Sequence, residues 1–322
     1  MTSQPLLLRH HRPFVAFWFA RIFTASAFQM LTVAIGWNLY QLTGNVMDLG
    51  WVGLIEFAPR VLFMLHTGHV ADRYDRRRVA ALCQSLQAMI ALTLAISSLS
   101  GSITREMIFI LAFLLGAARS FELPTTQALL PSIVPVALFP RAVAAAQAAQ
   151  QSATIIAPAF GGLLYAFGSV WVYGPSVALY LIAALLMSNL PARQAALNKG
   201  KATLDSLLGG IRFIRRHPDV LGAISLDLCA VLLGGATALL PVFAKDILLT
   251  GPLGLGMLRS APAVGALLMS LWLARFAVER RNRTIHSRMR EYLYELKHHD
   301  QLQTSIIPLG DGVALSVKRS DI

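Results

Sequence analysis

The chain has 322 residues, of which 56% are hydrophobic and only 14% are charged. Soluble domains carry roughly 25% charged residues, so this composition excludes a water-soluble enzyme and a disordered chain, and the two cysteines exclude a disulfide scaffold. The formal net charge of +12 leaves nucleic-acid binding open until the positions of the basic residues are considered.

Eight apolar runs, taken in chain order, have the length of membrane-spanning segments. A helix needs roughly 20 apolar residues to cross about 30 Å of hydrocarbon. In lipid every backbone polar group must be paired internally, so such runs must be helices. The runs are Phe14–Leu39, Leu49–Thr67, Val79–Leu99, Met107–Leu123, Val143–Phe167, Val170–Leu190, Val220–Val242 and Leu253–Phe276. The sequence therefore predicts an all-α membrane protein.

Lys and Arg residues gather in alternate connections between these runs. Thirteen fall on one side, counted with the N-terminal segment, whereas the other side has only Arg105 and Lys245. The positive-inside rule then predicts a multi-pass protein of the inner cell membrane with both termini in the cytoplasm. The basic residues are expected to set topology and to contact membrane lipid, and we expect no nucleic-acid partner.

Charged residues inside the apolar runs are candidate functional groups, because such positions are costly in lipid. Glu56 and Arg60 are four residues apart in the second run, and Arg119 and Glu122 are three apart in the fourth. Each spacing puts the two side chains on one helix face, where they can pair. Asp227 lies in the seventh run. Each carboxylate is either a proton-coupling group or a structural ion-pair partner, and the sequence leaves both interpretations open.

The connection between the second and third runs, residues 68–78, reads GHVADRYDRRR. It resembles the signature G-x-x-x-D-R-x-G-R-R of major facilitator transporters. The matching residues are Gly68, Asp72, Arg73, Arg76 and Arg77. Asp75 replaces the usual Gly, a variant associated with the drug and siderophore exporter branch. The resemblance implies a gating loop that latches two halves of a transporter, with Gly68 allowing close helix approach. A plain basic turn explains the arginines but not the Gly–Asp–Arg spacing.

Further stretches resemble the same branch. Residues 35–44 end the first helix, residues 127–131 follow the fourth, and residues 239–244 end the seventh. In the fifth helix Pro158, Gly161 and Gly162 resemble a Gly-Pro-rich antiporter motif. Plain close packing of helices on small residues is an equally good interpretation of this helix-five motif.

The order of the runs resembles that of major facilitator transporters, which are built from two six-helix halves. We expect a complete N-terminal half at 1–190, a cytoplasmic linker at 191–218 with an amphipathic surface helix, and a partial C-terminal half of two helices at 219–277. The resemblance thus implies a helix bundle truncated after its eighth helix.

The segment 278–322 is polar and is expected to form a short α+β cytoplasmic tail. Residues 283–297 predict an amphipathic helix, and two alternating runs around Pro308–Gly312 predict a β-hairpin. This tail resembles the C-terminal end of caffeoyl-CoA-type O-methyltransferases. The parts that would bind S-adenosylmethionine and metal have no counterpart upstream, so we expect no enzyme.

The resemblance implies a secondary active transporter that exports a small-molecule substrate by alternating access, with protons as the candidate coupling ion. We expect impaired transport, no cofactor and no metal site, because His66 and His69 lack further ligands nearby. Two alternatives stay open: a non-transporting membrane remnant or scaffold, and a membrane-tethered methyltransferase fragment.

Overall fold

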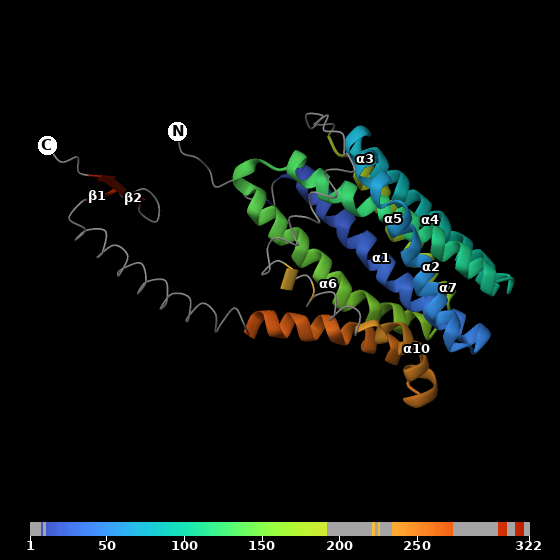
Figure 1. Ribbon diagram of the computed structural model, residues 1–322. Coiled ribbons are helices and arrows are strands. Elements are labelled where there is room, and N and C mark those ends of the chain that lie inside the picture. Colours follow the sequence, from blue (N-terminus) through green and yellow to red (C-terminus); the bar gives the residue numbers. More distant parts are fainter. Residues whose placement is uncertain are drawn as a thin grey trace. The chain divides into compact units, whose positions relative to one another are not determined.

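The computed structural model describes residues 8, 11–191, 221–222, 225, 234–272, 302–307 and 313–318. These residues are almost entirely helical (Figure 1). The main helices are α1 (Arg12–Thr43), α2 (Val46–Leu62), α3 (Met64–Arg73), α4 (Arg76–Leu99), α5 (Arg105–Ile133), α6 (Phe139–Tyr165), α7 (Val170–Ser188) and the helix Gly251–Trp272. Shorter pieces are η2 (Val136–Leu138), η3 (Gly234–Leu239), α10 (Leu240–Val242) and the π-helix η4 (Phe243–Ile247). The chain divides into two units, Met1–Ala263 and Val264–Ile322, which are described separately.

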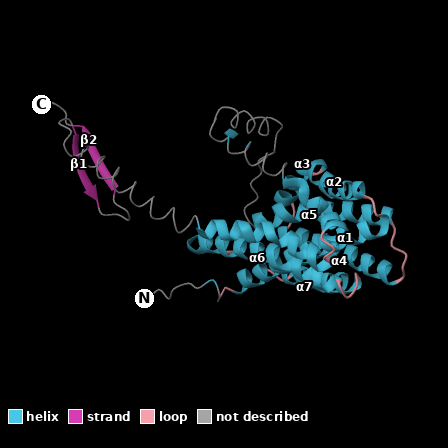
Figure 2. Cartoon of the chain, turned by 90° about the horizontal axis from the view of Figure 1, so that it is seen from below, coloured by secondary structure: helices cyan, strands magenta, loops and turns pink. Residues whose placement is uncertain are grey.

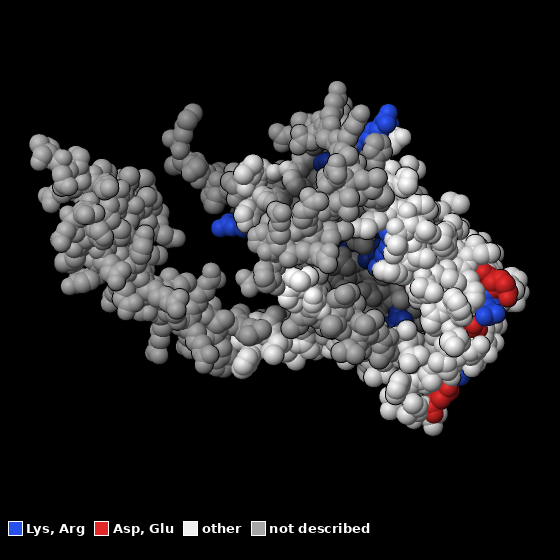
Figure 3. Space-filling view, in the orientation of Figure 1, with Lys and Arg blue, Asp and Glu red and all other residues white. Residues whose placement is uncertain are grey.

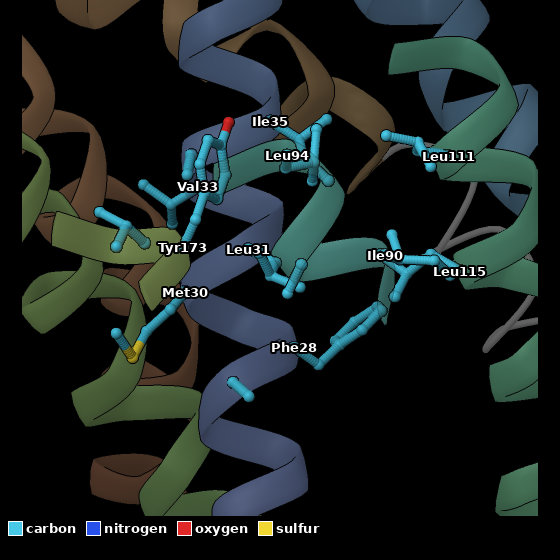
Figure 4. Close-up of a cluster of buried hydrophobic side chains, with 14 of the residues drawn as sticks. Phe28, Met30, Leu31, Val33, Ile35, Ile90, Leu94, Leu111, Leu115 and Tyr173 are labelled. Carbon is cyan, nitrogen blue, oxygen red and sulfur yellow. The ribbon is translucent and has the colours of Figure 1, made fainter. Parts of the chain in front are cut away.

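The first unit is a helix bundle in which α1 occupies the interior. It packs against α6 and α7, while α4 packs against α5 and α7, and α2 lies along α5 (Figures 1 and 2). Figure 4 shows Ile35 of α1 beside Leu94 of α4, and Ile90 of α4 beside Leu115 of α5. These side chains are buried and form one continuous apolar core.

Large apolar side chains also cover the outside of the bundle. Leu54 and Phe57 of α2 are 55% and 53% exposed, and Leu185 of α7 is 62% exposed. Exposed apolar surface on this scale is unusual for a protein in water and fits a lipid-facing surface. Five helices in the described part of the chain are long and apolar enough to cross a membrane: α1, α4, α5, α7 and Gly251–Trp272.

Most of the predicted runs coincide with described helices. The first six correspond in order to α1, α2 with α3, α4, α5, α6 and α7, and the eighth corresponds to Gly251–Trp272. The predicted end of the first helix is confirmed. Gly44 there adopts φ +61°, a left-handed conformation that glycine tolerates, and its N–H donates to the Tyr40 carbonyl at 3.0 Å.

Three predicted boundaries are wrong. The second run is divided at Phe63, whose backbone (φ −98°, ψ 3°) departs from the helical conformation between α2 and α3. Helix α5 continues through Pro124 and Pro131 to Ile133, so residues 127–131 belong to it rather than follow it. Membrane helices tolerate proline when other groups satisfy the backbone. Residues 239–244 do not end a helix either, because helical turns continue through η4 to Ile247.

Other predictions fall outside the described residues. These are most of the seventh run with Asp227, residues 192–218 of the linker, and the amphipathic helix at 283–297.

In the second unit the predicted strands are confirmed. Strand β1 (Leu302–Ile307) pairs antiparallel with β2 (Val313–Lys318), with Leu302 opposite Lys318 and Ile307 opposite Val313.

Candidate functional site

The arginine loop, residues 73–78, connects α3 to α4. Asp75 is the N-cap of α4, and its carboxylate accepts a hydrogen bond from the Arg77 backbone N–H at 3.1 Å. The same carboxylate accepts from the Arg77 guanidinium at 2.9 Å and lies 3.8 Å from Arg78. The hydrogen bonds from Arg77 hold the pKa of Asp75 below its ordinary value. Asp75, the departure from the usual signature, therefore starts the third predicted helix.

Two arginines of this loop fasten it to neighbouring helices. The Arg76 guanidinium donates to the Ala128 carbonyl of α5 at 2.9 Å. The Arg77 guanidinium donates to the carbonyl of Leu190, just after the end of α7. Charged donors form the stronger class of hydrogen bond. The loop is thus tied to α5 and α7 as well as capping α4.

The other signature residues play a smaller part in the described geometry. Arg73 ends α3 and is exposed, and Asp72 lies in α3 with a side chain outside the described set. A Cβ added to Gly68 would meet nothing within 4 Å in the described part of the chain. The predicted close helix approach at Gly68 is therefore not seen. It occurs instead at Gly116 of α5, where a Cβ would collide with the Glu56 backbone carbonyl of α2.

Both predicted ion pairs form. Glu56 lies 3.9 Å from Arg60 on α2, and Arg119 lies 3.8 Å from Glu122 on α5. The second pair is deeply buried, since its side chains are 8% and 6% exposed. Gln87 of α4 donates to the Glu122 carboxylate at 2.9 Å. Burial of this carboxylate is compensated by both an ionic and a neutral partner.

Arg119 also stacks on an aromatic ring of α1. Its guanidinium carbon is 3.7 Å from the centre of the Phe28 ring, a cation–π contact. One turn closer to the start of α1, Thr24 accepts a hydrogen bond from Gln84 at 3.0 Å. Helices α1, α4 and α5 thus share a buried polar cluster within the apolar core.

Sequence reasoning missed several members of this cluster. Arg259, in the helix Gly251–Trp272, lies near Gly36 of α1. Its signal was present, because an arginine inside an apolar run is costly. Gln84 and Gln87 gave no such signal, since neutral amides are common in helices. Arg21 donates to Gln150 of α6 at 3.4 Å within the bundle.

The helix-five motif lies where α6 meets two other helices. A Cβ on Gly161 would come within 3.0 Å of Met30 Cα on α1. A Cβ on Gly162 would collide with the Pro252 carbonyl, and one on Gly256 with the Pro158 carbonyl. Small residues here let α6 approach α1 and the helix Gly251–Trp272 closely.

The end of α1 contacts the segment around η4. The Tyr40 hydroxyl donates to the Asp246 carboxylate, and the Lys245 ammonium lies 4.9 Å from the centre of the Tyr40 ring. Nearby, Arg105 at the start of α5 pairs with the buried Asp48 of α2 at 2.6 Å. The start of α2, the start of α5 and the end of α1 therefore belong to the bundle end opposite the arginine loop.

No group of three or more potential metal ligands among His, Cys, Asp and Glu occurs in the described residues. What these residues do form is a bundle with an apolar exterior and ion pairs held in its interior. This organisation defines an integral membrane protein with several spanning helices.

The chain belongs to the Major Facilitator Superfamily, whose family model matches residues 17–289. It is 26% identical over 266 residues to the enterobactin exporter EntS of Escherichia coli (strain SMS-3-5 / SECEC), and the same figures hold for that of Shigella boydii serotype 18. These matches cover 82% of this chain, which spans 64% of the length of these relatives.

A crystal structure of a mutant nucleoside transporter, NupG, has the same fold, with a TM-score of 0.62 and 16% sequence identity. The match covers 83% of this chain and 70% of that one. The predicted resemblance to major facilitator transporters is thereby confirmed.

Proposed function

We propose that this protein is a secondary active transporter that exports a small molecule across the inner membrane by alternating access. The observation that carries the proposal is the charge cluster formed by the buried pair Arg119–Glu122 and the pair Glu56–Arg60, in a bundle of this superfamily. Superfamily transporters bind substrate near the midplane, where charged side chains are functional groups by default. Similarity to an enterobactin exporter supports export as the direction.

The contacts at the bundle end opposite the arginine loop support alternating access. Tyr40, from the predicted N-terminal half, bonds Asp246 from the predicted C-terminal half. The close approach of Gly162 to Pro252 joins the same two halves. In the proposal these contacts close the periplasmic end, both termini are cytoplasmic, and the contacts break when the halves rock.

The arginine loop has a gating role in the proposal. Arg76 and Arg77 bind carbonyls at the ends of α5 and α7, so a change in the position of either helix end is transmitted to α4. We assign Gly68, Asp72 and Arg73 to the same role from their match to the signature alone.

Protons are the proposed coupling ion, with Glu56, Glu122 and Asp227 as candidate carriers. Glu122 is already paired with Arg119 and Gln87, which favours a structural role for this carboxylate. Glu56 is the better candidate of the two described glutamates, because its carboxylate lies as far as 3.9 Å from Arg60 and receives no hydrogen bond from a neutral donor in the described residues.

The proposal is tested in inside-out membrane vesicles from cells that express the full 322-residue chain. A panel of fluorescent small molecules is offered with an imposed proton gradient, beside vesicles that contain EntS and vesicles with empty vector. We expect gradient-dependent uptake of at least one compound, in excess of that by empty-vector vesicles, because a secondary transporter uses the proton gradient to move its substrate. Uptake no greater than in empty vesicles would favour the membrane-scaffold alternative.

A further inference from the structure

Two glutamines of α4 reach from the interior of the bundle to two other helices. The side-chain nitrogen of Gln84 donates to the Thr24 hydroxyl of α1 at 3.0 Å, and that of Gln87 donates to the Glu122 carboxylate of α5 at 2.9 Å. Both glutamines are 0% exposed. On the face that Figure 3 shows, the described residues present few acidic or basic atoms, so the two amides contrast with a mostly uncharged exterior.

The oxygen atoms of the same two amides have no hydrogen-bond partner in the described residues. The same is true of the hydroxyl of Tyr180 on α7, whose side chain is also 0% exposed. Unpartnered polar atoms are costly in an apolar interior, and most buried polar groups are therefore paired with protein or with ordered water. These three atoms call for a partner, and their positions decide whether one partner can serve them all.

Tyr180 lies level with Gln87 in the antiparallel helices α7 and α4, which pack along each other. One hydrogen bond ties the two helices together at each end, and the partners are Arg77 with Leu190 and Ser98 with Ser169. At 1.5 Å per residue, Gln87 and Tyr180 are each about 15 Å along their helices from the first contact and about 17 Å from the second. Both ends therefore give the same alignment, which brings the hydroxyl-bearing side chain to the depth of the unpartnered amide oxygen.

The hydrogen-bonding groups of one water molecule match these three atoms. Gln84 and Gln87 are three residues apart, so their Cβ atoms are about 5–6 Å apart on one face of α4. A buried water typically has about three polar partners, and it can donate to two amide oxygens while it accepts from a hydroxyl. A metal cation fits less well, because Arg119 lies 3.8 Å from Glu122 and already supplies the positive charge for that carboxylate.

We propose that one ordered water molecule binds between Gln84, Gln87 and Tyr180 in the interior of the bundle. It donates to the two amide oxygens and accepts from the Tyr180 hydroxyl. Because the water holds the Gln87 oxygen, it keeps the amide nitrogen turned toward Glu122. The water thus joins α4 to α7 and orients the neutral partner of the buried ion pair. This inference does not depend on the proposed transport function.

Tyr180→Phe is a test in which a bridged and an unpartnered hydroxyl have opposite effects. If water bridges the hydroxyl, the variant loses a hydrogen bond, and the full chain in detergent should unfold at a lower temperature than the wild type. Tyr173→Phe is the matched control, because this tyrosine is equally buried and its hydroxyl accepts a hydrogen bond from Asn38 at 3.2 Å. We expect both variants to lower the unfolding temperature. An unchanged or higher value for Tyr180→Phe alone would overturn the proposal, since removal of an unpartnered hydroxyl relieves a buried polar group.

A double-mutant cycle shows whether Tyr180 and Gln87 share a partner. Gln87→Met roughly keeps the size of the side chain and removes the amide. In that background Tyr180→Phe is expected to lower the unfolding temperature less than it does in the wild type, because the bridge is already broken. Equal losses in the two backgrounds would contradict a shared water.

Hydroxyl-radical labelling identifies the ligand as water. Radicals that an X-ray pulse forms from a bound water oxidise the side chains next to it, and mass spectrometry of the digested chain locates the oxidised residues. We expect oxidation of Tyr180 in spite of its burial, and none of the equally buried Tyr173. Absence of label on Tyr180 would overturn the proposal.

A salt series separates water from a bound cation. Unfolding temperatures in lithium, sodium and potassium chloride at equal ionic strength are expected to agree, because water is present at the same concentration in all three. A rise confined to one cation would overturn the proposal in favour of a cation site.

Discussion

The arginine loop and the buried charge cluster use the same residue types in opposite surroundings. In the loop, Arg78 is 80% exposed and Asp75 is 37% exposed, whereas Arg119 and Glu122 in the cluster are 8% and 6% exposed. The loop arginines bind backbone carbonyls at helix ends, and the cluster arginines face carboxylates and an aromatic ring. The loop arginines hold helix ends together, and the cluster arginines place charge in the interior of the bundle.

The two regions differ in whether water can take the place of a lost ion-pair partner. Water reaches the loop and can take over a missing partner, so exposed ion pairs contribute about 0–1 kcal/mol. For the Arg119–Glu122 pair no such replacement exists, because both side chains are buried, and breaking a buried pair by removing one partner costs about 3–5 kcal/mol. Substitutions in the two regions should therefore differ in size even where the residues are alike.

The largest effect is expected from Glu122→Ala. It leaves the Arg119 guanidinium buried with the Phe28 ring but without its carboxylate, so the free energy of unfolding in detergent should fall by about 3–5 kcal/mol. Glu122→Gln keeps the size of the side chain and should cost less. Denaturant titration followed by circular dichroism measures both. A loss of stability in Glu122→Ala no greater than that in Asp75→Ala would contradict the difference between buried and exposed charges.

A smaller effect is expected from Gly116→Ala, which tests how tightly the helices that carry the cluster must approach. The new methyl group would collide with the Glu56 backbone carbonyl, so α2 and α5 must move apart at a cost of about 1–3 kcal/mol. Gly53→Ala on α2 is the matched control, because its Cβ would meet nothing within 4 Å in the described residues. Equal stability of the two variants in the same titration would contradict the close packing.

Much of the cluster could be predicted because charges inside apolar runs stand out. The pairs Glu56–Arg60 and Arg119–Glu122 follow from spacing on a single helix, which needs no tertiary information. Arg259 carried the same signal, but it lies near Gly36 of α1, and no pattern within one helix shows which helices its side chain meets. Gln87 was invisible for a simpler reason, since its amide gives no sign of burial in the sequence.

The helix boundaries show a second limit. Leu123-Pro124 predicts the end of a helix by the rules for water, yet α5 continues through Pro124 to Ile133, as membrane helices can. Glycine presents a similar problem. Gly68 stands in the recognisable signature, whereas the close contact is made by Gly116, whose neighbour is known only from the fold.

Arg77→Gln is expected to lower the stability of the protein moderately, and it tests the role of the arginine loop. The variant loses the hydrogen bond to the Leu190 carbonyl and the pair with Asp75, and the free energy of unfolding should fall by about 1–2 kcal/mol. Arg78→Gln is the control in the same loop. Its side chain is largely exposed and lies 3.8 Å from Asp75, so its loss should be close to neutral. A larger loss for Arg78→Gln than for Arg77→Gln would contradict these assignments.

The smallest effect is expected from Asp75→Asn, which separates helix capping from charge. Asparagine caps a helix about as well as aspartate, so the variant keeps the bond to the Arg77 N–H and loses only the exposed ion pairs, at a cost of up to about 1 kcal/mol at neutral pH. The pKa of Asp75 is lowered in the folded protein by its hydrogen bonds to Arg77. Its contribution is therefore fully present above the ordinary pKa of about 3.9 and is lost as the pH falls through the lower folded value. The wild type should then lose its advantage over Asp75→Asn below about pH 4, as measured by thermal unfolding over a pH series. If instead the two proteins differ most in acid, the loop carboxylate is not held ionised by Arg77, and the contrast with the interior pairs must rest on burial alone.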